Sequence, residues 1–149
     1  MRTLSACSAG FLLAVLWFDL MFDVQVRGTT AGDVPQRILD SISVYYARVT
    51  TSARPMNRLV ALAMLVTLGS VIGLVVNEEL ARWRSVAALV CVMGAIGVAA
   101  ARTVKNAVRL GGGNDDHRTQ SQLAQLILRD HIVCFGLIFV VILLIALPA

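Results

Sequence analysis

The segment that most constrains the fold runs from Phe11 to Asp23 and reads FLLAVLWFDLMFD. It is apolar enough to cross a bilayer, yet it carries Asp19 inside it and Asp23 one helical turn further on. A carboxylate within a membrane helix costs about 2.5–3.5 kcal/mol at mid-depth, so such a residue usually faces a bundle interior and meets a partner there. The segment therefore predicts a membrane helix whose acidic residues need polar partners from elsewhere in the chain.

The composition also favours a membrane protein. Of the 149 residues, 58% are hydrophobic and 15% are charged, whereas soluble domains have about 45–50% apolar and about 25% charged residues. The length corresponds to one domain. The net charge of +4 comes mostly from arginines at the ends of apolar segments. No basic helix face with interleaved aromatic residues is present, which excludes a nucleic-acid-binding protein.

Four apolar segments are long enough to cross the membrane, since about 20 helical residues span a hydrocarbon core of about 30 Å. We place these spans at about 4–24, 56–76, 85–103 and 131–148. The third and fourth helices are expected to project beyond the membrane on one side. The sequence therefore predicts an all-α polytopic membrane protein, in which residues 1–149 form a single antiparallel four-helix transmembrane bundle.

An additional amphipathic helix is expected at about 34–50. Asp33 is a suitable N-cap and Pro35 lies in the first turn. Apolar residues recur at helical spacing, but the segment is too polar to span the bilayer. It should lie at the interface or pack under the bundle. Its adjacent Tyr45 and Tyr46 are typical of the headgroup level.

The distribution of basic residues predicts the orientation. The termini and the second loop carry three basic residues, and the first and third loops carry ten. Because basic loops remain in the cytoplasm, both termini are expected on the extracytoplasmic side. The preference for arginine, alanine, valine and leucine suggests a bacterial genome rich in G and C. We therefore expect a multi-pass protein of the bacterial inner membrane.

Small residues indicate where helices pack closely. Gly69 and Gly73 form a GxxxG spacing in the second span, and small residues recur every four positions in the third. The expected helix-packing residues are Gly69, Gly73, Ala87, Cys91, Ala95 and Ala99.

Neither the cysteines nor the histidines form a motif for a metal or cofactor. Cys7, Cys91 and Cys134 have no CxxC spacing and are expected to be free thiols in apolar surroundings. His117 and His131 lie far apart, and nothing in the spacing supports a haem held by His131. We therefore expect no metal and no cofactor.

The polar ends of the spans are predicted to converge on the cytoplasmic side. Asp19 is expected to pair there with Arg58 or Arg102. This network either fixes the helix register or lines a polar pocket for a headgroup or an amphipathic substrate. His131, beside Asp130, can carry a proton near neutral pH. The candidate pocket residues are Asp19, Asp23, Arg54, Asn57, Arg58, Arg102, Asn106, Asp130 and His131.

Two short motifs carry a resemblance to a known family. The chain has N-A-V-x-L at 106–110 and R-D-H at 129–131, and together with its layout it resembles the anthrone-oxygenase-like family of small four-helix bacterial membrane proteins. The matching positions are Asn106 and His131. The two acids in Trp17–Asp23 depart from the family pattern. The resemblance implies a cofactorless oxygenase or a related protein for hydrophobic substrates.

Three classes of function remain open. The first is assembly, as a homo-oligomer or an accessory subunit of a membrane complex, with membrane lipids and other membrane subunits as partners. The second is an enzyme or binder of a lipophilic small molecule that uses the polar pocket. The third, a transporter or channel, is least favoured, because four spans without internal repeats and with one deep acid make a poor translocation path.

Overall fold

The computed structural model describes residues 1–30, 32–52 and 54–147, without the side chains of Arg54 and Met56. The described residues form helices and connecting turns, and no strand occurs among them. The elements are α1 (Arg2–Asp23), η1 (Val24–Val26), α2 (Gln36–Ala47), η2 (Arg48–Ser52), α3 (Arg54–Val76), α4 (Arg82–Val98), η3 (Ala99–Thr103), α5 (Val104–Gly112) and α6 (His117–Ala146). The predicted all-helical class is confirmed.

Four of these helical stretches are long and apolar enough to cross a membrane, as predicted: Arg2–Val26, Asn57–Val76, Arg82–Gly112 and His117–Ala146. Helix α6 begins at His117, so the helix that contains the predicted span at about 131–148 extends well before that span, as the sequence predicts. The end of the predicted fourth span, at 148, lies outside the described residues.

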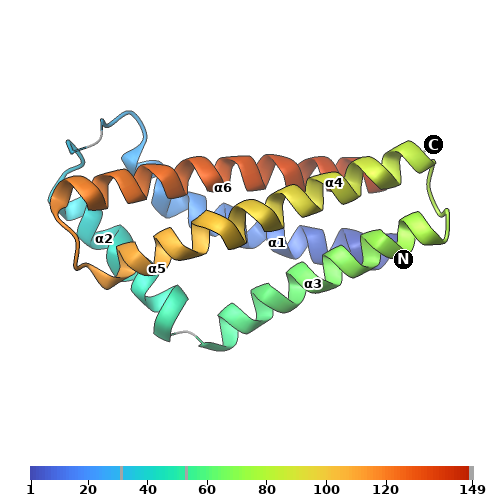
Figure 1. Ribbon diagram of the computed structural model, residues 1–149, viewed down its shortest axis with the longest axis horizontal. Helices are drawn as coiled ribbons and strands as arrows, with labels where there is room; N and C mark the ends of the chain where they lie inside the picture. The colour runs from blue at the N-terminus through green and yellow to red at the C-terminus, as the bar shows by residue number, and fades with distance from the viewer. Residues whose placement is uncertain (31, 53, 148–149) are drawn as a thin grey trace.

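The long helices run side by side along the long axis of the molecule (Figure 1). Helix α6 contacts α1 and α4, and α1 also contacts α3. Both termini lie at one end (Figure 1), where the Met1 ammonium is 3.1 Å from Glu79 Oε1 and Arg2 Nη2 donates to the Ile145 carbonyl. These contacts hold the α3–α4 loop and the end of α6 against the start of α1.

Two apolar cores stabilise the structure. The first lies between the long helices and contains small and medium residues such as Ala9, Leu12, Val92 and Ile138. The second lies at the opposite end from the termini, where α2 packs against α5 and α6 (Figure 1). Leu39, Ile42 and Tyr46 of α2 are buried there. The amphipathic segment therefore packs under the bundle, one of the two placements expected for it.

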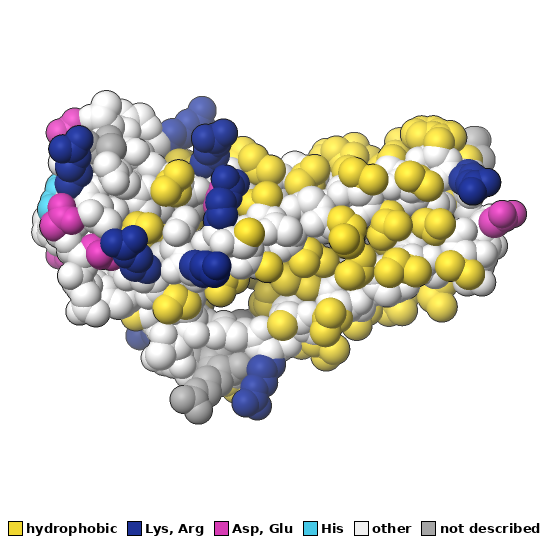
Figure 2. Space-filling model, viewed as in Figure 1, with side chains coloured by type: hydrophobic (Ala, Val, Ile, Leu, Met, Phe, Trp, Pro, Cys, Tyr) yellow, Lys and Arg dark blue, Asp and Glu magenta, His cyan; other side chains and the backbone are white. Residues whose placement is uncertain are grey.

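Large hydrophobic side chains remain exposed on the outer faces of the long helices. Leu65 is 66% exposed and Val90 is 65% exposed, although leucine and valine are among the residues most often buried in soluble proteins. Figure 2 shows hydrophobic side chains over much of one face, with lysine and arginine gathered toward the α2 end. This surface is more apolar than water-soluble monomers expose.

The expected helix-packing residues contribute unequally. Ala95 is buried and its carbonyl accepts a weak hydrogen bond from Cys134 Sγ at 3.5 Å, whereas Ala87, Cys91 and Ala99 are half-buried. Gly73 lies against the side chain of Met1. Gly69 is exposed, and no described atom lies within 4 Å of the position a Cβ would take. The GxxxG pair therefore does not form a close helix crossing within the described chain.

Candidate functional site

Two carboxylates of α1 meet an imidazole of α6 near the α2 end of the bundle. His131 Nδ1 lies 2.6 Å from Asp23 Oδ2, and His131 Nε2 lies 3.9 Å from Asp19 Oδ2. Asp23 is completely buried and His131 is 7% exposed. The one-turn spacing of Asp19 and Asp23 places both acids on the same face of α1, so that one histidine reaches both.

Two tyrosines of α2 complete this group. The Tyr46 hydroxyl donates to Asp23 Oδ1 at 2.6 Å, and the Tyr45 hydroxyl donates to Asp19 Oδ1 at 2.6 Å. Asp23 therefore uses one oxygen for Tyr46 and the other for His131. We refer to Asp19, Asp23, Tyr45, Tyr46 and His131 as the polar centre.

Close packing of α2 on α5 places the tyrosines. The Ser43 hydroxyl donates to the Leu110 carbonyl at 2.6 Å. Gly111 approaches the backbone of α2 so closely that a Cβ at this position would be 2.6 Å from the Ala47 nitrogen. A glycine is thus required for α2 to bring its tyrosines to the carboxylates of α1.

Both tyrosines remain neutral hydrogen-bond donors. Burial, together with the negative charges of Asp19 and Asp23, raises the pKa of Tyr45 and the pKa of Tyr46 far above the ordinary value of 10.0. A phenolate beside these carboxylates would place like charges together in a buried site. The hydroxyls therefore act as fixed donors to the two acids.

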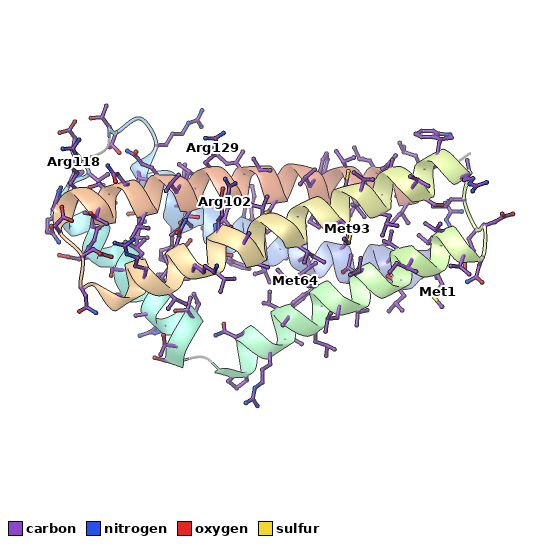
Figure 3. All side chains as sticks on the ribbon, in the orientation of Figure 1. Met1, Met64, Met93, Arg102, Arg118 and Arg129 are labelled. Carbon is purple, nitrogen blue, oxygen red and sulfur yellow. The ribbon has the colours of Figure 1, made fainter. Side chains whose placement is uncertain are left out.

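A cavity of about 620 Å³ adjoins the polar centre. Its volume lies within the range of about 300–1,000 Å³ that small-molecule sites occupy. Most of its lining is apolar and comes from α1, α3, α4, α5 and α6. Figure 1 shows α3 diverging from α4 and α5 toward this end, and Met64, labelled in Figure 3, lines the cavity from α3. The polar residues that line the cavity are Asp19, Tyr45, Tyr46, Thr50, Asn57, Thr103 and His131.

A separate ion pair lies beside this site. Arg102 Nη2 donates to Asp130 Oδ1 at 2.8 Å, and the Thr103 hydroxyl is 3.3 Å from Asp130 Oδ2. Asp130 is buried, whereas the Arg102 side chain is 60% exposed. The arginine therefore neutralises a buried acid of α6 from the outer surface.

The prediction that Asp19 pairs with Arg58 or Arg102 is wrong. In the part of the chain that the structure describes, Asp19 accepts a hydrogen bond from Tyr45 and faces His131, and Arg102 serves Asp130. Arg58 is exposed and does not line the cavity. The partners of Asp19 are therefore the Tyr45 hydroxyl and the His131 imidazole, and not an arginine guanidinium.

The other predicted pocket residues are dispersed. Asn57 lines the cavity, and its amide donates to the Thr50 carbonyl at 2.7 Å. Asn106 is half-buried on α5 and is not part of the lining. The side chain of Arg54 lies outside the described part of the structure. Of the predicted set, Asp19, Asp23 and His131 therefore come together, with Asn57 across the cavity.

Sequence reasoning missed Tyr45 and Tyr46 as members of the site, because it placed them at the headgroup level. A signal was available, since a tyrosine that becomes buried needs a partner for its hydroxyl. Ile38, Ile42 and Tyr46 share helical spacing with the apolar face of α2. This spacing predicts that Tyr46 is buried.

The geometry suits proton exchange with a bound molecule. When Asp23 is ionised it can only accept a hydrogen bond, so it fixes a proton of His131 on Nδ1, while Nε2 lies 3.9 Å from Asp19 Oδ2. Among the described residues, no hydrogen bond is made by Nε2. A base oriented by a buried carboxylate is the arrangement used in acid–base catalysis. No group of three or more histidine, cysteine, aspartate or glutamate residues suited to a metal occurs in the described chain.

Comparison with protein-family models, with curated proteins and with solved structures gives no match for this chain. The resemblance to anthrone-oxygenase-like proteins, carried by Asn106 and His131, therefore stays a prediction.

Proposed function

We propose that the chain is a multi-pass membrane protein that binds a lipophilic small molecule in the cavity beside the polar centre. One observation carries the proposal: an apolar cavity of about 620 Å³ has its ionisable groups gathered on the side where His131 lies. Binding sites for small molecules combine mostly apolar walls with a few polar groups that fix orientation. The cavity has this composition.

The exposed apolar faces support insertion into a membrane. The four long helical stretches then form an antiparallel bundle whose hydrophobic outer surface contacts lipid tails. The basic α2 end lies on the cytoplasmic side of a bacterial inner membrane, with both termini on the other side. Lipids are then the first partners of the protein.

Cysteine labelling tests this orientation. In a variant without Cys7, Cys91 and Cys134, we would introduce either Glu78→Cys in the α3–α4 loop or Asn114→Cys in the α5–α6 loop. A membrane-impermeant maleimide should modify the Glu78→Cys variant on intact cells, and the Asn114→Cys variant only after permeabilisation. The reverse pattern would contradict the orientation, and labelling of both without permeabilisation would contradict the span count.

The position of the cavity supports access from the bilayer. Phe18, Ala61 and Val108 line the cavity and are also exposed on the outer surface. In a membrane, this surface faces lipid. A lipophilic molecule dissolved in the bilayer could thus reach the cavity without crossing an aqueous phase.

The polar centre gives this binding site a chemical capacity. A proton on an acidic O–H or C–H group of the bound molecule moves to His131 Nε2, and the resulting imidazolium is stabilised by Asp19 and Asp23. The return of the proton completes an acid–base cycle. This capacity agrees with the hydrophobic-substrate chemistry that the anthrone-oxygenase-like resemblance implies.

Binding of pyrene, a neutral lipophilic fluorophore, tests the proposed function. Native mass spectrometry of the detergent-purified protein should detect saturable binding of pyrene at one molecule per chain. Ala61→Trp, which fills the cavity from its rim, should abolish this binding. The matched control is Leu62→Trp, because Leu62 is exposed and does not line the cavity. Equal binding by both variants, or no saturable binding to the unaltered protein, would refute the proposal.

A second candidate function is assembly, as a homo-oligomer or as an accessory subunit. Its support is the exposed face of α3, where Leu62, Leu65, Gly69 and Ile72 lie at helical spacing. An exposed glycine allows a second helix to approach closely. Mass measurement of the protein in detergent separates the two candidates, since a monodisperse monomer without co-purifying subunits would count against assembly and leave ligand binding intact.

A further inference from the structure

The cavity has an unusual charge inventory. Among the described residues that line it, Asp19 is the acidic side chain and His131 the basic one, and none is lysine or arginine. Asp23 stands directly behind His131. Arg102, the basic residue nearest in sequence to the lining residue Thr103, is engaged by Asp130. Figure 3 shows Arg129 on the far side of α6 from Met64.

The polar centre has an excess of negative charge. One imidazole faces two carboxyl groups, so when both acids are ionised a protonated His131 leaves one negative charge uncompensated and a neutral His131 leaves two. Tyr45 and Tyr46 donate hydrogen bonds but supply no positive charge. An uncompensated charge in a low-dielectric environment is costly. A positively charged ligand would lower this cost.

Two atoms of the polar centre remain available to a ligand. Asp19 Oδ1 accepts from Tyr45, but Asp19 Oδ2 makes no hydrogen bond within the described chain and is 3.9 Å from His131 Nε2. Although His131 is 93% buried, its Nε2 is also without a hydrogen bond there and the residue lines the cavity. An N–H donor placed beside Asp19 Oδ2 would satisfy the free carboxylate oxygen.

Aromatic rings line the same part of the cavity. Phe22 and Tyr45 stack with their ring centroids 4.0 Å apart, and both belong to the lining. Phe18 also lines the cavity. The faces of aromatic rings attract cations within about 6 Å, and desolvation strengthens the attraction. These rings therefore suit a cation better than an anion of the same shape.

We infer that the ligand of this cavity is a lipophilic cation, a protonated amine on an aromatic or aliphatic body, whose N–H donates to Asp19 Oδ2. This inference rests on the proposed function, because it assigns the charge of the molecule that the cavity binds. The apolar walls hold the body of the amine, and the polar centre neutralises its charge.

Three probes that share the pyrene ring system but differ in charge separate a preference for cations from the binding of lipophilic molecules in general. They are pyrene, 1-pyrenylmethylammonium and 1-pyreneacetate, titrated by fluorescence anisotropy against the protein in uncharged detergent, with empty micelles as the reference. We expect the dissociation constant of the ammonium to be at least about tenfold lower than that of the acetate, which corresponds to about 1.4 kcal/mol. The comparison requires no mutation, so it decides the inference even if a variant fails to fold.

Variants then assign the preference to Asp19. Asp19→Asn should weaken the ammonium about tenfold relative to pyrene, whereas Asp19→Glu should keep most of the preference. Asp115→Asn is the matched control, because it removes one negative charge at the same end of the molecule from a residue outside the cavity lining. It should leave the ratio of ammonium to acetate unchanged.

The outcomes are distinguishable. If 1-pyreneacetate binds as tightly as the ammonium while pyrene still binds saturably, the cation inference is overturned and the proposed function stands. An unchanged ratio in a folded Asp19→Asn variant also overturns it. Loss of saturable binding for all three probes overturns the proposed function itself.

Discussion

His131 Nδ1 and Asp23 Oδ2 lie 2.6 Å apart, although the two residues are 108 positions apart in the chain. This contact joins α1 to α6, and the Tyr46 hydroxyl adds α2 to the same carboxylate. The buried side chain of Asp23 thus connects α1, α2 and α6. The carboxylate also orients the imidazole, so Asp23 both joins the helices and positions His131.

Asp23→Asn is expected to destabilise the protein strongly. The amide keeps the shape of the side chain but loses the charge-assisted bond to His131 and leaves a buried group imperfectly paired. We expect the free energy of unfolding to fall by about 2 kcal/mol. Unfolding in mixed micelles with increasing SDS measures the change. As a control, Asp115→Asn breaks a surface ion pair with Arg109 and should cost much less, because solvent screens such a pair. Equal costs would contradict a buried ionic role for Asp23.

The two adjacent tyrosines are expected to differ. Tyr46 is 2% exposed and Tyr45 is half-buried, although each donates one hydrogen bond of 2.6 Å to a carboxylate. Tyr46→Phe should therefore lower the free energy of unfolding by about 1.5 kcal/mol and Tyr45→Phe by about 0.5 kcal/mol, since water can replace a lost partner only where it has access. The same micelle titration compares the pair. A larger loss of unfolding free energy for Tyr45→Phe than for Tyr46→Phe would contradict the burial of Tyr46 and of its partner Asp23.

The pattern of apolar residues in the sequence was sufficient to predict the four apolar helices and α2. Segment length and composition located the four apolar helices, and the amphipathic pattern located α2. The requirement that Asp19 find a partner was also readable from the sequence, because a buried carboxylate is costly. The identity of that partner was not, since it depends on how α1, α2 and α6 are rotated against each other. The pairing of Arg102 with Asp130 likewise could not be predicted from the charges at the ends of the spans.

The cavity had no signature in the sequence. It exists because α3 diverges from α4 and α5 (Figure 1), and because several of the residues that line it are small. Ala61, Ala95, Ala99 and Ala107 lie on four different elements, and each also fits an ordinary helix interface. Only their arrangement around a common space leaves the volume unfilled.

The first turn of α6 should make a small pH-dependent contribution to stability. The hydrogen bond from the Thr119 hydroxyl lowers the pKa of Asp116 below its ordinary value of 3.8. A carboxylate whose pKa is lower in the folded state stabilises the protein fully above the ordinary pKa, and this stabilisation is lost as the pH falls through the folded-state pKa. Thr119→Val should raise the pKa of Asp116 in an NMR titration, whereas Thr119→Ser should preserve it. An unchanged pKa in Thr119→Val would assign the lowering to another group.

Arg84 is expected to hold the end of α6. Its side chain is buried at 6% exposure, with Nε and Nη2 donating to the Leu144 carbonyl and Nη2 donating to the Leu147 carbonyl at 2.5 Å. Carbonyls at a helix end lack partners within the helix. Arg84→Gln should lower the free energy of unfolding by about 2 kcal/mol and speed amide exchange in the last turn of α6. Arg82→Gln, at an exposed position, is the control, and equal exchange in the two variants would contradict the capping role.

The last prediction compares two neighbouring glycines at the contact between α5 and α2. A Cβ on Gly111 would lie 2.6 Å from the Ala47 nitrogen and 2.9 Å from the Tyr46 carbonyl carbon, whereas a Cβ on Gly112 would meet its nearest neighbour at 3.6 Å. Backbone cannot yield as a flexible side chain does, so Gly111→Ala must push α2 away from α5 and carry Tyr45 and Tyr46 from their carboxylates. Overpacking of this kind costs about 1–3 kcal/mol, and saturable pyrene binding should weaken together with stability. Gly112→Ala should be close to neutral in both measurements. If Gly111→Ala were also neutral in both, the placement of α2 against α5, and with it the geometry of the polar centre, would be wrong.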